Sequence, residues 1–283
     1  MKYVVTALVL CLLILFFTYE ETDREICLIS YNIKYDNRQE GENSWSGRKD
    51  ELIQLLDDYN PDIFGIQEGL AHQVKEIQKA LGPMSYVGVG RDDGHEKGEY
   101  CALFYDTTRY QVMNSSTFWL SETPDTISVG WDAALERICT MALFEDRSSS
   151  QRLWVLNTHF DHVGKEARVQ SARLISSRVK ELQKDGYPVI LMGDLNAKPG
   201  ERPITILGEV MNDALSISRK PLEGPEGTYN GFQDVISSNR IDYFFASTIA
   251  IESYEHVDRL LKDGGQISDH QAVVIKAKFD WDF

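Results

Sequence analysis

The sequence predicts an α/β protein in which two mixed β-sheets pack against each other and the helices lie on the outside. Ten strand-like segments outnumber three helical ones, and hairpin-like strand pairs are mixed with helical crossovers. That combination is typical of layered, mixed sheets. No Pro/Gly/Ser-rich linker or internal repeat divides the 283 residues, and 42% hydrophobic with 26% charged residues is the composition of a globular protein. We therefore expect one compact domain.

The strand-like segments are short runs rich in apolar and β-branched residues. Residues 147–151, between two of them, are predicted to form a hairpin loop. The ten segments cover residues 26–32, 62–67, 86–89, 100–106, 110–120, 137–145, 152–159, 188–193, 241–246 and 271–279.

Apolar residues recur at helical spacing in three segments, which cover residues 47–59, 71–81 and 165–184. The first ends before Pro61, which cannot continue a helix. The last is followed by Gly186, a residue that commonly ends a helix.

The first 24 residues form a separate element. Residues 3–19 carry no charge, and this run of 17 is at the short end of what spans a bilayer, where roughly 20 are usual. It is either an uncleaved signal anchor or a signal peptide, and the lack of a small-x-small site before Glu20 favours the anchor. Lys2 before the run and acidic residues after it place residues 25–283 outside the cytoplasm. Cleavage of the segment would instead make the domain secreted or periplasmic.

The formal net charge of −15 bears on the partners of the protein. Polyanions such as duplex DNA are bound mainly through Lys and Arg, so long-range repulsion opposes their binding here. A bound divalent cation changes the local field. The charge therefore disfavours a general nuclease without excluding one.

Five short polar motifs lie where apolar runs end. Four follow strand-like stretches and the fifth precedes one. Because a sheet gathers its strand ends along one rim, amides, carboxylates and imidazoles at these places are expected to converge on a cleft. The motifs are Ser30-Tyr31-Asn32, Gln67-Glu68, Asn157-Thr158-His159, Gly193-Asp194-Leu195-Asn196 and Ser268-Asp269-His270.

Hard oxygen ligands dominate these motifs and their surroundings. No Cys/His cluster has the spacing of a zinc site, and oxygen-rich ligation suits Mg²⁺ or Mn²⁺ better than Zn²⁺. Hydrolysis of a phosphate ester needs such a cation, an activated water and a donor to the developing charge. The oxygen-bearing candidates are Asn32, Glu68, Asp194, Asn196, Asp242 and Asp269.

Together with Arg240-Ile241-Asp242-Tyr243, the five motifs resemble in their order those of the endonuclease/exonuclease/phosphatase superfamily. That superfamily includes DNase I-type nucleases, deadenylases, inositol polyphosphate phosphatases and neutral sphingomyelinases. The resemblance covers about residues 26–276 and implies a DNase I-like sandwich of two mixed sheets with helices outside. A little-characterised bacterial branch is the most similar, through Glu42-Asn43-Ser44-Trp45, residues 88–94, residues 118–124 and Gly130-Trp131-Asp132.

The resemblance implies a Mg²⁺ or Mn²⁺ site. Glu68 resembles the main metal carboxylate, with Asn32 beside it as ligand or orienting amide. Asp269 holds His270 in position and also reaches a metal. Whether one or two metals bind stays open. Each residue alone has a structural explanation, such as an Asx turn at Asn32, but the ordered set favours a catalytic site.

The resemblance also implies the catalytic roles. Asp194 orients or deprotonates the attacking water, and His270 is the general base or a phosphate-contacting imidazole, so the choice of base between them stays open. Asn196 holds that water or a phosphate oxygen. His159 donates to the phosphoryl oxygens, with Asp242 as its supporting partner.

Three further residues are candidates for substrate contact. Arg137 is suited to clamp a substrate phosphate, although a surface ion pair explains it equally well. Asp161 lies just beyond the third motif and is expected at the rim of the site or as an added ligand. Trp131 would stack on a sugar or base, or simply pack in the interior.

We therefore predict that residues 25–283 are a divalent-metal-dependent phosphoesterase domain in which an activated water attacks phosphorus in line. An acidic domain on a short anchor favours a small phosphorylated substrate, either a sugar phosphate or a lipid head group. A nuclease or exonuclease acting on DNA or RNA is the alternative. A non-catalytic binding module is disfavoured because every core motif position is filled.

Overall fold

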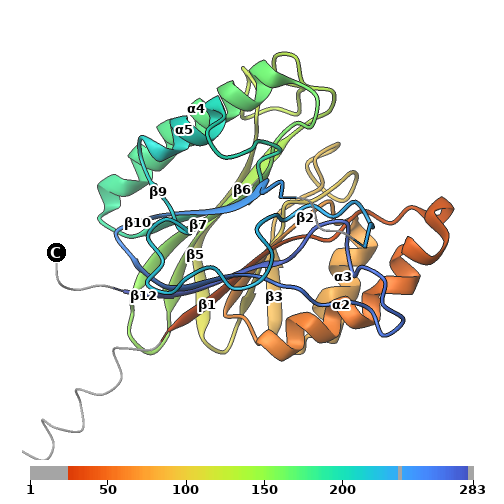
Figure 1. Cartoon of the computed structure of the whole chain (residues 1–283). Coiled ribbons are helices and arrows are strands. Elements are labelled where there is room, and N and C mark those ends of the chain that lie inside the picture. Colours follow the sequence, from red (N-terminus) through yellow and green to blue (C-terminus); the bar gives the residue numbers. More distant parts are fainter. Residues whose placement is uncertain (1–24, 235–237, 280–283) are drawn as a thin grey trace, which may run out of the picture.

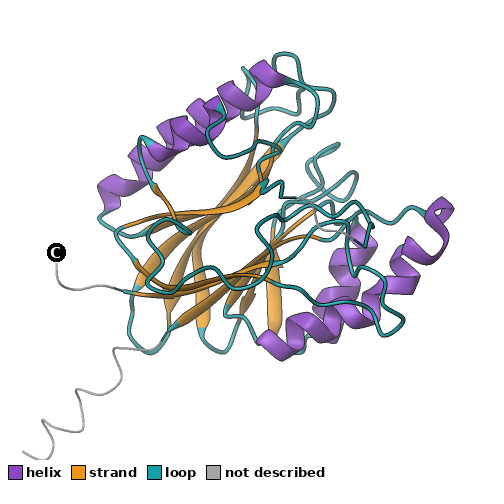
Figure 2. Cartoon of the chain, viewed as in Figure 1, coloured by secondary structure: helices purple, strands orange, loops and turns teal. Residues whose placement is uncertain are grey.

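The structure is a computed structural model, in which residues 25–234 and 238–279 are described. Two β-sheets lie face to face at its centre, and helices flank them (Figures 1 and 2). The strands of the first sheet are β1 (Ile26–Asn32), β2 (Ile63–Gln67), β3 (Met84–Val87), β4 (Leu103–Asp106), β11 (Ala250–His256) and β12 (Val273–Lys278). Those of the second sheet are β5 (Tyr110–Trp119), β6 (Ile138–Asp146), β7 (Arg152–His159), β8 (Val189–Asp194), β9 (Asn212–Asp213) and β10 (Asp242–Ser247).

Each sheet has six strands and contains one parallel pair. The first sheet has the order β11-β12-β1-β2-β4-β3, with β1 and β2 parallel, and the second has the order β5-β6-β7-β8-β10-β9, with β7 and β8 parallel. The other pairs are antiparallel. The predicted sandwich of two mixed sheets is therefore confirmed. The helices are η1 (Arg38–Asn43), α2 (Trp45–Tyr59), α3 (Ala71–Ala80), α4 (Lys165–Leu182), η2 (Gln183–Asp185) and α5 (Arg202–Gly208).

Strand β1 illustrates how the layers form. Ile26 and Leu28 belong to the apolar cluster between the sheets, whereas Ile29 and Tyr31 belong to the cluster that α2 and α3 cover. Since successive side chains of a strand point to opposite faces, one apolar strand fills both layers. Helices α4 and α5 cover the outer face of the second sheet in the same way (Figure 1).

The strand directions bring the motifs to one rim. Asn32 pairs with Gln67 at the end of β1–β2, and His159 pairs with Asp194 at the end of β7–β8. Strand β10 runs antiparallel to β8, so its first residue, Asp242, lies opposite Asp194. Strand β12 runs antiparallel to β1, so the residues just before β12 reach the same rim.

A buried amide pair joins the two sheets beneath this rim. Gln67 Nε2 donates to Asn157 Oδ1 at 2.7 Å, and Asn157 Nδ2 donates to the carbonyls of Ile66 (2.8 Å) and Ala102 (2.9 Å). Both amides are fully buried. Gly65 leaves room for them, because a Cβ at that position would lie 2.7 Å from Asn157 Cγ. The amide pair therefore depends on a glycine in β2.

Most predicted elements are present, with shifted ends in β3 and β4, and the predicted loop at residues 147–151 does connect β6 to β7. The sequence analysis missed η1, α5, β9 and β11. Helix α5 has seven residues and β9 has two, which is too short for a periodic signal. In β11 a register shift between Ile251 and Ser253 breaks the alternation of apolar and polar residues that would have revealed the strand.

The expected anchor at residues 3–19 and the linker up to residue 24 lie outside the described residues. Within residues 25–234 and 238–279, no helix is long and apolar enough to cross a membrane.

We expect Asn157→Ala to lower the free energy of unfolding by about 2–4 kcal/mol, because two buried carbonyls and the Gln67 amide lose their partner. Urea unfolding followed by circular dichroism measures the change. The matched control is Asn114→Ala in the exposed stretch of β5, where about 0.5 kcal/mol or less is expected. Similar midpoints for the two variants would contradict a structural role of the inter-sheet amide pair.

Candidate active site

Asn32, the last residue of β1, lies at the centre of the rim. Its buried Nδ2 donates to Glu68 Oε1 at 3.0 Å and to Asp194 Oδ2 at 3.1 Å, so one amide bridges carboxylates from the two sheets. Its Oδ1 accepts from the backbone N–H of Lys34 at 3.1 Å. The Asx turn considered from the sequence is therefore present, and it coexists with the bridging role.

His270 is held by Asp242. His270 Nδ1 lies 2.9 Å from Asp242 Oδ2, and both side chains are buried. The sequence analysis assigned Asp242 to His159 and gave Asp269 the task of holding His270, so both pairings require correction. The reason is the register of β10, which places Asp242 beside the segment that precedes β12, a long-range relation that spacing along the chain does not reveal.

Asp194 faces three nitrogen-bearing side chains. Its Oδ2 lies 3.1 Å from Asn32 Nδ2, 3.4 Å from His159 Nε2 and 3.7 Å from His270 Nε2. Its Oδ1 accepts from the backbone N–H of Asn196 at 2.9 Å, which fixes the carboxylate. The Asn196 side-chain nitrogen in turn lies 3.1 Å from His159 Nε2. The Asp194 carboxylate is thus contacted by residues from β1, from β7, from the loop after β8 and from the segment that precedes β12.

Burial and charge shift the pKa values of this cluster in different directions. Burial, and after it the charge of Asp242, raises the pKa of Asp194 to about 7. Burial lowers the pKa of His159 well below its usual value, and the positive charge of Arg137 adds to the effect. Burial also acts to lower the pKa of His270, but Asp242 and Asp194 outweigh it and raise that pKa well above its usual value. Groups with such divergent proton affinities at one place are typical of catalytic sites.

A second pair of carboxylates shares a lysine. Lys34 Nζ lies 3.1 Å from Asp269 Oδ2 and 3.9 Å from Glu68 Oε2. The backbone of Lys34 is left-handed, with φ of 55°, and its carbonyl accepts from Gln73 Nε2 at 3.0 Å. Glu68 also has a positive φ, 63°, and accepts from the backbone N–H of Tyr35 at 3.3 Å. An internal cation therefore lies between two residues predicted to bind metal.

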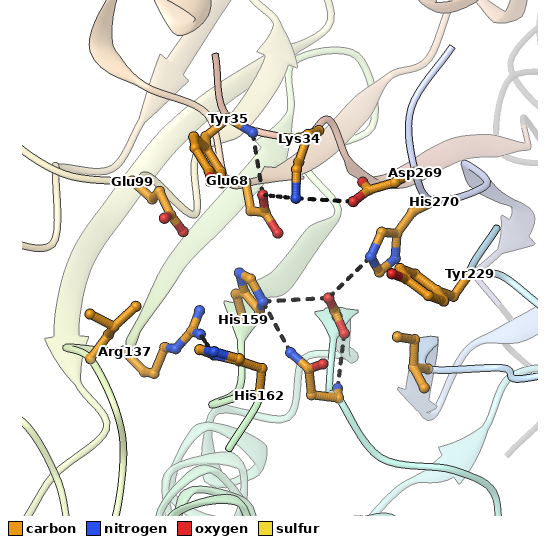
Figure 3. Close-up of a pocket in the computed structure, with 14 residues that line it drawn as sticks. Lys34, Tyr35, Glu68, Glu99, Arg137, His159, His162, Tyr229, Asp269 and His270 are labelled. Carbon is orange, nitrogen blue, oxygen red and sulfur yellow. Dashed lines mark hydrogen bonds and ion pairs between the residues drawn. The ribbon is translucent and has the colours of Figure 1, made fainter. Parts of the chain in front are cut away.

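These side chains line one cavity of about 510 Å³ (Figure 3). Of the residues predicted from the sequence, Asn32 and Asp242 lie behind its wall and support it, through the contacts described above. The lining consists of Lys34, Tyr35, Glu68, Glu99, Leu135, Arg137, His159, His162, Asp194, Asn196, Tyr229, Ile241, Asp269 and His270.

The three candidates for substrate contact have different positions. Arg137 lines the cavity. Asp161 is 1% exposed and supports Arg137, since its Oδ2 lies 3.3 Å from Arg137 Nε and its Oδ1 accepts from the backbone N–H groups of Val163 and Gly164. Trp131 is not among the described residues that line the cavity. The structure thus brings one of the three to the site directly and a second one indirectly.

Several lining residues were missed from the sequence. Lys34 and Tyr35 lie two and three residues after Asn32, and this proximity to the first motif was the available signal. Glu99 precedes Tyr100, which bridges to Gly69 just after the second motif, and no local pattern reveals that pairing. The remaining missed residues, which come from loops, are Leu135, Tyr229 and Ile241.

The open rim of the two-sheet sandwich brings together carboxylates, imidazoles and amides. These are the functional groups that a hydrolase uses. Carboxylates accept protons and bind cations, and imidazoles donate to oxyanions. Asp194, Asp242 and His270 each offer a ligand atom, and these atoms all lie within 4.8 Å of one another. The arrangement is therefore able to bind a cation, hold a water and stabilise negative charge.

Comparison with known proteins defines the family. The chain belongs to the Endonuclease/Exonuclease/phosphatase family, which it matches over residues 29–270. Enzymes of this family hydrolyse phosphate esters and use divalent metals. The resemblance stated from the motifs is confirmed, as is the prediction of a phosphate ester hydrolase.

Solved bacterial structures are similar over nearly the whole chain. A family protein from Bacteroides thetaiotaomicron is 33% identical, with a TM-score of 0.87, over 92% of this chain and 99% of that one. The mannosyl-6-phosphatase Bt3783 from Bacteroides thetaiotaomicron VPI-5482 is 34% identical, with a TM-score of 0.85, over 90% of this chain and 100% of that one.

Curated relatives match over only part of their length. The CCR4-Not complex 3'-5'-exoribonuclease subunit Ccr4 from Mycosarcoma maydis is 23% identical over 234 residues, which are 64% of this chain and 35% of that protein. The match to the uncharacterised mimivirus protein L388 is 26% identical and covers 54% of this chain and 59% of that one. The chain thus spans between about a third and three fifths of the length of these relatives.

Removal of the Lys34 charge should make the protein more responsive to divalent cations. In Lys34→Met the carboxylates of Glu68 and Asp269 lose their shared cation, and we expect a loss of about 1 kcal/mol of stability without metal. Mg²⁺ should then raise the melting temperature of Lys34→Met more than that of the wild type, since the metal restores the lost charge balance. Differential scanning calorimetry with EDTA and with added Mg²⁺ measures both effects.

The control is Lys49→Met, which breaks a surface ion pair with Glu76. Its response to Mg²⁺ should equal that of the wild type. An equal Mg²⁺ response in Lys34→Met and Lys49→Met would contradict the interpretation of Lys34 as an internal counter-ion.

Proposed function

We propose that the protein hydrolyses the phosphate ester of a small phosphorylated molecule, foremost a sugar phosphate, with Mg²⁺ or Mn²⁺ as its cofactor. The observation that carries this proposal is the cavity. Its volume of about 510 Å³ is that of pockets that enclose small molecules, and the buried Asp/His cluster lies along it. Similarity to a mannosyl-6-phosphatase supports the same substrate class.

The charge of the protein supports a small substrate over a nucleic acid. A net charge of −15 repels a polyanion over distances comparable to the Debye length, about 8 Å at physiological ionic strength. A single phosphate group carries at most two charges into the cavity, whose lining includes the Lys34 ammonium. The repulsion therefore acts much more strongly on a polymer of phosphates than on a monoester.

The residues present fit a divalent cation. Glu68 and Asp269 carry the carboxylates that share Lys34, and Asp242 Oδ1 is buried without a hydrogen-bond partner among the described residues. Such hard oxygens suit Mg²⁺ and Mn²⁺. We assign Glu68 and Asp269 to hold the metal, with Asn32 as the amide that orients Glu68 through its Nδ2. When bound, it neutralises charge on the phosphoryl group and on the leaving oxygen.

The chain's own residues position the phosphoryl group and the water. Asp194, which Asn32 and the Asn196 backbone hold in place, orients the water and accepts its proton. His270, held by Asp242, contacts a phosphoryl oxygen from the opposite side of the cluster. His159 lies next to Asp194 and donates to another phosphoryl oxygen. In-line attack requires this spread of contacts around the phosphorus.

The proposed substrate agrees with the location outside the cytoplasm that the N-terminal segment predicts. A domain tethered outside the cytoplasm through residues 3–19, or released after cleavage, would meet phosphorylated sugars or lipid head groups there.

Substrate profiling of the full chain in mild detergent tests the proposal. The panel contains hexose phosphates, p-nitrophenyl phosphate, sphingomyelin, bis-p-nitrophenyl phosphate and oligonucleotides, each with Mg²⁺, with Mn²⁺ and with EDTA. We expect phosphate release from hexose phosphates that depends on the cation. Glu68→Gln, Asp194→Asn and His270→Gln should each lower kcat/KM by roughly 10²- to 10⁴-fold, because each removes a group from the reacting centre.

Glu181→Gln, an exposed position on α4, serves as the matched control and should retain wild-type kinetics. Turnover of oligonucleotides alone would favour the nuclease alternative. Hydrolysis that survives all three active-site substitutions would overturn the assignment of the site.

A further inference from the structure

We propose that Glu99 and Arg137 form a subsite that binds the hydroxyl groups of the substrate's sugar ring, with His162 at its edge. This inference rests on the proposed function and specifies which part of the substrate the enzyme recognises. It concerns the end of the cavity that the catalytic residues do not occupy.

The cavity has two distinct ends. His270 and Asp269 lie at one end, and Glu99 and Arg137 lie on the other side of His159 (Figure 3). A phosphate held between His159 and His270 therefore directs its ester group either out of the cavity or toward Glu99 and Arg137. Only the second direction keeps the organic part of the substrate in contact with the protein.

The charges of this subsite are neutralised within the protein. Glu99 accepts from both terminal nitrogens of Arg91, at 2.7 and 2.9 Å. Arg137 pairs with the buried Asp161, whose Oδ2 lies 3.3 Å from Arg137 Nε. Each ion pair cancels its own charge, so the subsite offers no net attraction to a second phosphate. The Glu99 carboxylate at the cavity wall would in addition repel one.

Hydrogen-bonding capacity remains after these pairs have formed. A carboxylate oxygen accepts more than one hydrogen bond, so Glu99 is able to accept further hydroxyl donors. Arg137 is 4% exposed and places Nη2 2.9 Å from His162 Nδ1, while its Nη1 has no hydrogen-bond partner among the described residues. A buried donor without a partner is costly, and an acceptor brought by a ligand or by an accompanying water would satisfy it.

A sugar ring matches this chemistry. Each hydroxyl both donates and accepts, so neighbouring hydroxyls are able to donate to Glu99 and accept from Arg137 at the same time. Of the two aromatic residues that line the cavity, Tyr229 lies beside His270, and Tyr35 lies between Glu68 and Glu99 (Figure 3). Paired hydroxyls of a polyol therefore match the subsite through the acceptor of Glu99 and the donor of Arg137.

The inference is tested by the discrimination between two monoesters, measured with the full chain. Hexose 6-phosphates carry the ring hydroxyls, and p-nitrophenyl phosphate lacks them. The alkoxide of a hexose is a poorer leaving group than p-nitrophenolate, so alkyl phosphates of similar leaving-group pKa serve as the reference for reactivity. Relative to these alkyl phosphates, we expect the wild type to show a higher kcat/KM for the hexose phosphate. Glu99→Gln and Arg137→Lys should raise KM for the hexose phosphate by roughly tenfold or more, as expected for lost hydrogen bonds to charged groups, and should change kcat less.

Two further variants guard against misfolding and non-specific effects. His162 has a side chain that is 52% exposed, so His162→Ala should fold normally and lower the preference for the hexose phosphate by a few fold. Glu145 on β6 pairs with Arg152 on β7, and Glu145→Gln, which breaks this pair, should leave the preference unchanged. The melting temperature of each variant shows whether it is folded. If Glu99→Gln is unfolded, the result for His162→Ala decides whether the subsite exists.

The outcomes separate the two levels of the argument. Cation-dependent hydrolysis of both esters, without preference for the hexose phosphate or with equal losses for both esters in the variants, would overturn the subsite and leave the proposed function standing. No hydrolysis of any monoester by the wild type would overturn both. A selective rise of KM for the hexose phosphate supports the subsite.

Discussion

The rest of the structure depends on the buried contact between Gln67 and Asn157, which fixes how the two sheets meet. Apolar packing holds the sheets together but is not directional, and it would tolerate small shifts of one sheet over the other. An amide pair at 2.7 Å does not tolerate them, because a displaced buried amide loses its partners. The glycine at position 65 lets the two layers approach closely enough for this contact. The relative position of the two sheets is thus fixed immediately below the rim that carries the candidate active site.

Registration matters because the site is divided between the sheets. Asn32 ends β1 of the first sheet and Glu68 directly follows β2 of that sheet, whereas His159 and Asp194 belong to the second sheet. A single amide nitrogen of Asn32 reaches carboxylates of both groups at 3.0 and 3.1 Å, which is close to the optimum for a hydrogen bond. A shift of one ångström between the layers would break one of these bonds, so the geometry of the candidate site depends on the inter-sheet amide pair.

The sequence was sufficient for the architecture and for the motifs that converge at the candidate site, because both are encoded locally, but it did not reveal the loop residues Glu99, Leu135 and Tyr229 that complete the cavity. Apolar runs mark strands, and polar residues at their ends mark a rim. Partnerships across the fold are not encoded locally. The pairing of Asp242 with His270 follows from the antiparallel register of β10, and the position of Glu99 follows from a bridge between Tyr100 and Gly69. A bulge likewise concealed β11. The sequence therefore predicted which motifs converge at the candidate site, but it did not predict which side chains contact one another there.

The distribution of charge explains how an acidic protein can handle a phosphate ester. The net charge of −15 acts at long range and disfavours extended polyanions. Inside the cavity the balance differs, since Lys34 offsets two carboxylates and the pairs Glu99–Arg91 and Arg137–Asp161 cancel internally. Glu68 and Asp269 would hold a divalent cation, which would supply further positive charge beside the Lys34 ammonium. The positive charge available to a phosphate ester is therefore local to this part of the cavity, whereas the repulsion from the net charge acts at long range.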